Sequence, residues 1–237
     1  MPFYDFWRNK QVTGIGKLWA AQAASYTLDQ ITRHVRPLHR VVEIGPGRGP
    51  FTRACQERGL TYTAVDANIG LLHELPGADG VCSFVPPLPL RDNVADVAVA
   101  NHVIEHAPDL PHAEAMLGEM CRIVRPGGCV ALTTPDLLWY GQYFWDCDYS
   151  HNFATSARRL YQLFLDQGLE IAALSYVHNH LTGLPGHLAG RAAQLAAYRL
   201  PGAMPGSPLY SDQIYKARLT FARCVLIIGR RPGEAQP

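Results

Sequence analysis

The sequence predicts an α/β fold: a doubly wound sheet of about seven strands, with a helix before the first strand and a helical insert before the last. Two observations lead to this prediction. Short apolar runs typical of buried strands alternate with segments of helical periodicity from residue 40 to residue 177. The chain has 237 residues, which is enough to bury a sizeable core as one domain.

The elements follow one another in a regular order. Strands are predicted at residues 40–45, 61–67, 80–85, 95–101, 129–135, 169–177 and 217–231. Helices are predicted at residues 17–35, 51–59, 111–124 and 156–168. Because helices separate most of the strands, the sheet is expected to be largely parallel and covered on both faces.

A Gly/Pro-punctuated insert at residues 178–217 precedes the last strand and holds one predicted helix, at residues 187–199. It exceeds the usual loop length, so we expect it to have a role. It could form a lid over a substrate, a contact in a homodimer, or extra packing.

Composition narrows the class of partner. The net charge is +1 and 17% of the residues are charged, with no basic run, which argues against nucleic acid and acidic membranes. The N-terminus lacks the continuous apolar segment of a signal peptide or membrane span. The six cysteines include no CxxC pair, as expected for reduced thiols in the cytoplasm. A cytoplasmic protein with a small or neutral partner is therefore expected.

The turn "EIGPGRG" at residues 43–49 directly follows the first strand, where doubly wound sheets bind ligands. Its glycines are Gly45, Gly47 and Gly49, and Pro50 occupies the place of the third glycine of a dinucleotide fingerprint. Glu43 would repel a pyrophosphate and attract a cation. The ligand should therefore present a positive group here, although the glycines could also serve only a tight turn.

Asp66 ends the second strand, where an acid typically binds two ribose hydroxyls. It could instead cap the next helix. A ribose at Asp66 and an ammonium group near Glu43 describe S-adenosylmethionine better than NAD. A nicotinamide-dependent oxidoreductase is therefore disfavoured.

Three further segments complete a pattern: "NHVIEH" at 101–106, "RPGGCVALTTPD" at 125–136 and "DYSHNFATSARRLYQLFLDQGLEI" at 148–171. With the glycine turn, they resemble the class I S-adenosylmethionine-dependent methyltransferases, of the type 11 and type 23-like small-molecule group. The resemblance covers residues 40 to 177. It implies a Rossmann-like sheet whose last strand is antiparallel, and S-adenosylhomocysteine as the product.

We accordingly divide a single methyltransferase domain, residues 1–237, into four parts. They are an N-terminal helical cap (1–39), a cofactor-binding core (40–177), an insert or lid (178–217) and the last strand (218–231).

The cofactor-binding residues implied by this resemblance are Glu43, Gly45, Gly47, Gly49, Asp66, Ala67, Phe84, Asn101 and His102. The family often has an acid after the third strand that binds the adenine amino group, but this chain reads "CSFVPPLPL" there. The Phe84 ring or nearby backbone groups would have to replace it. Arg48 could meet the methionine carboxylate or point to solvent.

Methyl transfer from a sulfonium needs alignment of donor and acceptor and no nucleophilic side chain. A base that deprotonates a hydroxyl acceptor would add about 10²–10⁴-fold. His106 and His151 are the catalytic candidates, because they follow the fourth and fifth strands near the expected methyl group. Each could instead be a substrate clamp or a structural residue.

A metal is the alternative to a base. Related enzymes hold a metal with "ExxEH" and a further histidine, and this chain offers His102, Glu105, His106 and His151. Since His102 stands where the first glutamate would be, we assign no metal site.

The aromatic residues at 139–145 could border an acceptor pocket or pack as core. We expect a small-molecule or glycan acceptor, methylated on oxygen. The alternative from another class is a non-catalytic protein that binds the cofactor and regulates or scaffolds a partner.

Overall fold

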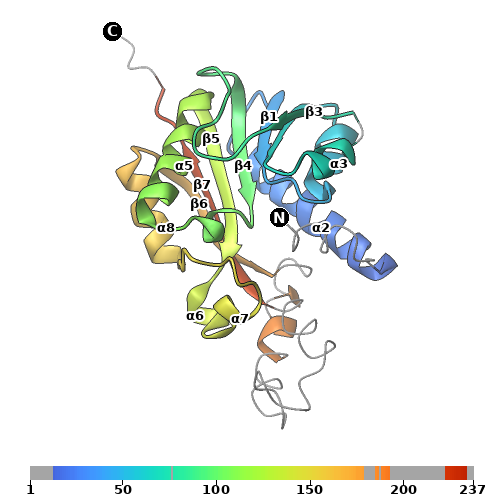
Figure 1. Ribbon diagram of the computed structural model, residues 1–237, viewed down its shortest axis with the longest axis vertical. Helices are drawn as coiled ribbons and strands as arrows, with labels where there is room; N and C mark the ends of the chain where they lie inside the picture. Colours follow the sequence, from blue (N-terminus) through green and yellow to red (C-terminus); the bar gives the residue numbers. More distant parts are fainter. Residues whose placement is uncertain (1–12, 76, 179–184, 187, 193–221, 234–237) are drawn as a thin grey trace.

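The computed structural model describes residues 13–75, 77–178, 185–186, 188–192 and 222–233. A seven-stranded sheet runs through them in the order β3-β2-β1-β4-β5-β7-β6 (Figure 1). The strands are β1 (Arg40–Ile44), β2 (Thr61–Asp66), β3 (Asp79–Cys82), β4 (Ala95–Asn101), β5 (Val124–Pro135), β6 (Glu170–His178) and β7 (Arg223–Arg230). The longer helices are α2 (Gly14–Thr32), α3 (Pro50–Glu57), α5 (Leu110–Ile123) and α8 (Ala157–Asp166).

The predicted fold class is confirmed, including the direction of the last strand. Strands β1 to β5 pair in parallel, whereas β7 runs antiparallel to both of its neighbours, β5 and β6. Parallel strands place their carboxyl ends at one edge of a sheet. The residues that follow β1, β2, β4 and β5 therefore share that edge.

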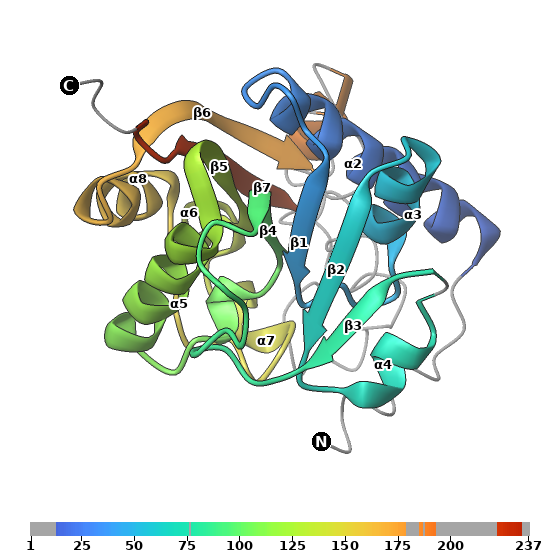
Figure 2. The ribbon, with the colours of Figure 1, turned by 90° about the horizontal axis from the view of Figure 1, so that it is seen from above.

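Helices cover both faces of the sheet, as seen from above in Figure 2. On one face, Leu28 of α2 and Phe51 of α3 belong to the same buried cluster as Val97 of β4. On the other face, Leu117 of α5 and Phe164 of α8 pack with Ala98, the next residue of β4. Successive strand side chains point to opposite faces, so a strand with both faces covered is apolar throughout.

Several element boundaries differ from the prediction. The third strand ends at Cys82 and not at residue 85, shortly before Pro86 and Pro87, which have no N–H for a sheet ladder. Helix α2 begins at Gly14, three residues early, because Thr13 caps it by accepting a hydrogen bond from the Gly16 N–H at 3.2 Å. Strand β5 begins at Val124, which pairs with Ala95.

Periodicity also missed the shortest elements, which contain too few residues to show a repeat. They are α4 (Ile69–His73), η1 (Ile104–His106), α6 (Leu137–Tyr140) and α7 (Tyr143–Asp146). In the insert, residues 188–192 are helical as predicted, and the rest of the helix expected at 187–199 lies outside the described residues. The same is true of residues 217–221 of the last predicted strand.

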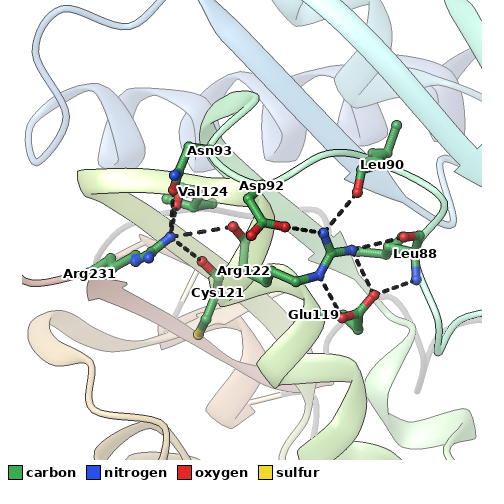
Figure 3. A network of polar contacts seen from close by, with 9 residues as sticks. All are labelled: Leu88, Leu90, Asp92, Asn93, Glu119, Cys121, Arg122, Val124 and Arg231. Atoms are coloured by element: carbon green, nitrogen blue, oxygen red, sulfur yellow. Dashed lines mark hydrogen bonds and ion pairs between the residues drawn. The ribbon is translucent and has the colours of Figure 1, made fainter.

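Two arginines tie the loop before β4 to α5 and to the end of β7 (Figure 3). Arg122 binds both carboxylate oxygens of Glu119, at 2.8 and 2.9 Å, and donates to the Leu88 and Leu90 carbonyls at 2.9 and 2.8 Å. Arg231 donates to the Asn93 side-chain oxygen at 2.8 Å. Polar contacts thus fix the loop before β4.

Among the helices in the described ranges, none has the length and apolar character to span a bilayer. All six cysteines lie in these ranges, and no disulfide joins them.

Candidate active site

The glycine turn lies between β1 and α3 and depends on glycine at each of its three positions. Gly45, Gly47 and Gly49 have φ angles of +64°, +55° and +71°, which other residues rarely adopt. A Cβ at Gly45 would also lie 2.6 Å from a methyl of Val103, the residue before η1. The turn and η1 are therefore neighbours, although they come from different strands.

Glu43 is a buried acid beneath this turn, with 2% of its surface exposed. Its carboxylate accepts hydrogen bonds from the Tyr62 hydroxyl and, at 3.1 Å, from the Asn101 side-chain amide. Thr52 of α3 extends the network by donating to the Tyr62 oxygen at 2.9 Å. Burial raises the pKa of Glu43 to about 7, and the nearby charge of Asp66 adds to this, while the bonds from Tyr62 and Asn101 oppose it.

Asp66 ends β2 next to this network. It accepts a hydrogen bond from the Asn68 N–H at 2.7 Å, and partial burial raises its pKa above the ordinary value. The helix cap of α4 is Asn68 and not Asp66, since the Asn68 side chain accepts from the Gly70 N–H at 2.9 Å. Ala67 is exposed beside Asp66, and the Phe84 ring, 69% exposed, follows β3, whose end pairs with Asp66.

Asn101 and His102 follow β4, as predicted. The His102 N–H donates to the Thr133 carbonyl at 2.8 Å, and its φ of +57° turns the chain out of the sheet into η1. Its imidazole lies 3.3 Å from a Glu105 oxygen. Partial burial lowers the pKa of His102, but contacts with Cys224 and Glu105 outweigh it and raise the pKa well above the usual range.

Glu105 is fully buried within η1, with none of its surface exposed. Its carboxylate accepts a hydrogen bond from the Thr134 hydroxyl of β5 at 3.0 Å. Burial would raise its pKa, but the hydrogen bond and charge of His102, together with His106, lower it below the ordinary value. A charged carboxylate therefore lies inside the site.

His106 is oriented by a chain of two polar residues. Asp148 accepts from the Ser150 hydroxyl at 2.6 Å, and the Ser150 oxygen lies 2.8 Å from Nδ1 of His106. Because the Ser150 proton is directed to Asp148, Nδ1 of His106 is assigned as the donor, and the neutral ring carries its lone pair on Nε2.

His151 is held in the same way. Its Nδ1 lies 2.7 Å from the Phe144 carbonyl, which can only accept, so the neutral ring again carries its lone pair on Nε2. His151 is 8% exposed, and burial lowers its pKa, which favours the neutral form. The rings of His106 and His151 meet edge to face, with centroids 4.9 Å apart. The structure thus brings the two catalytic candidates together.

Residues 139–145 divide between two environments. Tyr140 and Phe144 are buried in a small cluster with Ala222, which is core packing, whereas Trp145 is exposed. Tyr62, Ser150 and Asp148 were not among the predicted site residues. Their partners are 19 and 44 residues away for Tyr62 and Ser150, and no local pattern signals such contacts.

Comparison with known proteins identifies the class. A family model described as a methyltransferase domain matches residues 19–174. An uncharacterized methyltransferase of a Mycobacterium species (strain JLS) is 32% identical over 107 residues, or 44% of this chain and 40% of that protein. A malonyl-[acyl-carrier protein] O-methyltransferase of Pectobacterium atrosepticum is 34% identical over 99 residues, or 40% of this chain and 38% of that protein. The matched part thus spans about two fifths of these relatives.

The solved structures agree on the fold. A SAM-dependent methyltransferase from Archaeoglobus fulgidus superimposes with a TM-score of 0.60 at 18% identity, over 89% of this chain and 94% of that one. The chain belongs to the methyltransferase domain family, an enzyme family with the class I, S-adenosylmethionine-dependent fold. The resemblance to methyltransferases noted in the sequence is confirmed.

Proposed function

We propose that this protein transfers the methyl group of S-adenosylmethionine to an oxygen of a small molecule or glycan. The observation that carries the proposal is the meeting of two sets of residues at one sheet edge. Gly45 of the cofactor turn closely approaches Val103, and η1, which begins at the next residue, ends in His106. The donor would therefore lie beside the paired histidines.

In this arrangement, Asp66 binds the ribose and the exposed Phe84 ring packs on the adenine. Glu43 lies below the methionine ammonium group as a buried negative charge. Asn101, whose side-chain amide donates a hydrogen bond to Glu43, connects this carboxylate to the cofactor pocket. The glycines, Ala67 and the backbone of His102 line the cofactor. We also propose that the chain forms one methyltransferase domain with the four parts defined above.

His106 and His151 prepare the acceptor oxygen. An imidazole with its lone pair on Nε2 can accept the proton of a bound hydroxyl, and the Nδ1 hydrogen bond of each ring assigns the lone pair to Nε2. The relatives named as malonyl-[acyl-carrier protein] O-methyltransferases support an oxygen acceptor.

The absence of disulfides among the six cysteines supports a reducing compartment such as the cytoplasm.

Calorimetric titration with S-adenosylmethionine and S-adenosylhomocysteine tests the cofactor site. We expect wild type to bind both and Asp66→Ala to lose at least about tenfold in affinity, since charge-assisted hydrogen bonds contribute about 1.5–3 kcal/mol. Asp79→Ala is the matched control, because Asp79 is an exposed acid at the other end of the β2–β3 pair. A folded wild type that binds neither ligand would refute the proposal.

An acceptor screen then follows S-adenosylhomocysteine release with phenols, hydroxy acids and sugars. Turnover that falls in His106→Ala and His151→Ala, while cofactor affinity persists, would support the acceptor side of the site. Cofactor binding with no turnover on any acceptor would favour a regulatory protein.

A further inference from the structure

Three side chains of metal-ligand type converge at the acceptor side of the site. Glu105 and His106 come from η1, and His151 comes from the loop before α8. One ligand atom of each residue lies within 4.8 Å of those of the other two. Ligands on a tetrahedral zinc ion with bonds of about 2.0–2.1 Å lie roughly 3.4 Å apart, so only a modest closure would be needed.

Backbone hydrogen bonds preassemble this set. The Glu105 carbonyl accepts from the Asn152 N–H at 2.9 Å and from the Phe153 N–H at 3.0 Å. The residue before Asn152 is His151, so these bonds fix the loop that carries the second imidazole against η1. The three side chains are therefore brought together by backbone hydrogen bonds between η1 and this loop.

Both imidazoles also have the orientation that metal ligands require. A metal-bound histidine almost always donates its other ring N–H to a fixed acceptor, which sets the tautomer and the ring plane. The acceptors are the Ser150 oxygen for His106 and the Phe144 carbonyl for His151, at 2.8 and 2.7 Å. In each ring, Nε2 is therefore the ligand nitrogen.

We propose that Glu105, His106 and His151 form a binding site for a divalent first-row transition metal. Two imidazoles and one carboxylate match zinc best and leave a position for a further ligand. His102 is not in this set: it lies beside the carboxylate, with Nδ1 3.3 Å from a Glu105 oxygen.

The catalytic use of this metal rests on the proposed function, whereas metal binding does not. An acceptor hydroxyl in the open position would bind to the metal, which lowers the pKa of that hydroxyl, and its proton would pass to water. The oxygen lone pair then forms the bond to the methyl carbon. The carbon–sulfur bond breaks with its electron pair going to sulfur, which leaves S-adenosylhomocysteine. The metal would thus replace an imidazole base.

The test is a titration of chelator-treated full-length protein with CoCl2, followed by visible absorption, and with ZnCl2, followed by calorimetry. We expect one ion per chain in wild type. His106→Ala and His151→Ala should each weaken binding by more than about 100-fold, and Ser150→Ala by about 10–100-fold, as for loss of an orienting partner. Mg²⁺ prefers oxygen ligands, so added MgCl2 should not compete with cobalt or zinc.

Two variants serve as controls. His112→Ala removes an exposed histidine of α5 that contacts Asp109, the residue before this helix. Cys82→Ser removes an exposed thiol. Neither should change the affinity for cobalt or zinc. The fold of each variant is checked by circular dichroism and by its affinity for S-adenosylhomocysteine.

Wild type that binds no ion saturably would overturn the proposal, as would unchanged affinity in folded His106→Ala and His151→Ala. If these two variants do not fold, Ser150→Ala decides, and unchanged metal affinity in it would count against the site. The cofactor titration reports separately on the proposed function. Metal binding without cofactor binding would refute the methyltransferase proposal and leave the metal site standing. Cofactor binding without metal binding would refute the metal site alone.

Discussion

The clearest residue-scale feature is a buried acid whose pKa lies near neutrality. The Glu43 carboxylate accepts hydrogen bonds from the Tyr62 hydroxyl and the Asn101 amide, and burial raises the pKa of Glu43 to about 7. In the folded protein without cofactor, a substantial fraction of Glu43 is therefore protonated at neutral pH. A bound ammonium group would stabilise the carboxylate, so cofactor binding and loss of this proton are coupled.

The affinity for S-adenosylhomocysteine should consequently depend on pH. Below about pH 7 the proton on Glu43 must be removed before binding, so affinity should fall toward a limit of about tenfold per pH unit and level off above that pH. Calorimetry between about pH 5.5 and 7.5 measures the slope. Glu43→Gln cannot ionise and should bind weakly with a flat profile. A sloping profile in that variant would show that another group is responsible.

The loop before β4 is held by two side chains of α5, Arg122 and Glu119, and by Arg231. Arg122, in the last turn of α5, donates to the Leu88 and Leu90 carbonyls and to both oxygens of Glu119 (Figure 3). Glu119 in turn accepts from the Leu88 N–H at 2.7 Å. These contacts supply backbone partners to a proline-containing loop that lacks a sheet ladder.

Arg122→Ala should therefore destabilise the protein by about 1–3 kcal/mol, because several charge-assisted hydrogen bonds are lost together. Urea unfolding followed by circular dichroism gives the change. Arg91→Ala is the matched control: it removes an exposed arginine of the same loop and should change the free energy of unfolding by no more than about 0.5 kcal/mol. Equal effects of the two substitutions would mean that the network contributes little.

The proposed cofactor site is complete only when the whole sheet is assembled. Its residues follow β1, β2, β3 and β4, and the histidine pair draws on β4 and on the chain after β5. An unfolded chain cannot gather these groups. A ligand of this site should bind the native state alone and should shift the unfolding equilibrium by mass action.

S-adenosylhomocysteine at about 100 times its dissociation constant should thus raise the free energy of unfolding by about 2.7 kcal/mol. Chemical unfolding with and without the ligand measures this difference. At the same ligand concentration, Asp79→Ala should keep the full stabilisation, whereas Asp66→Ala, with at least about tenfold weaker binding, should keep no more than about 1.4 kcal/mol of it. Full stabilisation in Asp66→Ala would place the ligand elsewhere.

Local sequence patterns were enough to predict the class of the protein. Apolar runs and helical periodicity are local, so they located the long elements, and the glycine turn and Asp66 follow their strands directly. Together with three further segments, these residues sufficed to indicate a methyltransferase, and the family match agrees. Element ends were missed because they depend on caps and on pairing with distant strands. One-turn helices such as η1 were missed because they are too short to show a repeat.

The partners of the site residues, by contrast, depend on how distant segments pack in the folded protein. Tyr62 meets Glu43 because β1 and β2 are neighbours, and Ser150 meets His106 because the loop after β5 folds back onto η1. The same packing buried Tyr140 and Phe144 as core and left Trp145 exposed. Such contacts join residues far apart in the chain, where local propensity carries no information, and they determine burial, tautomer and charge.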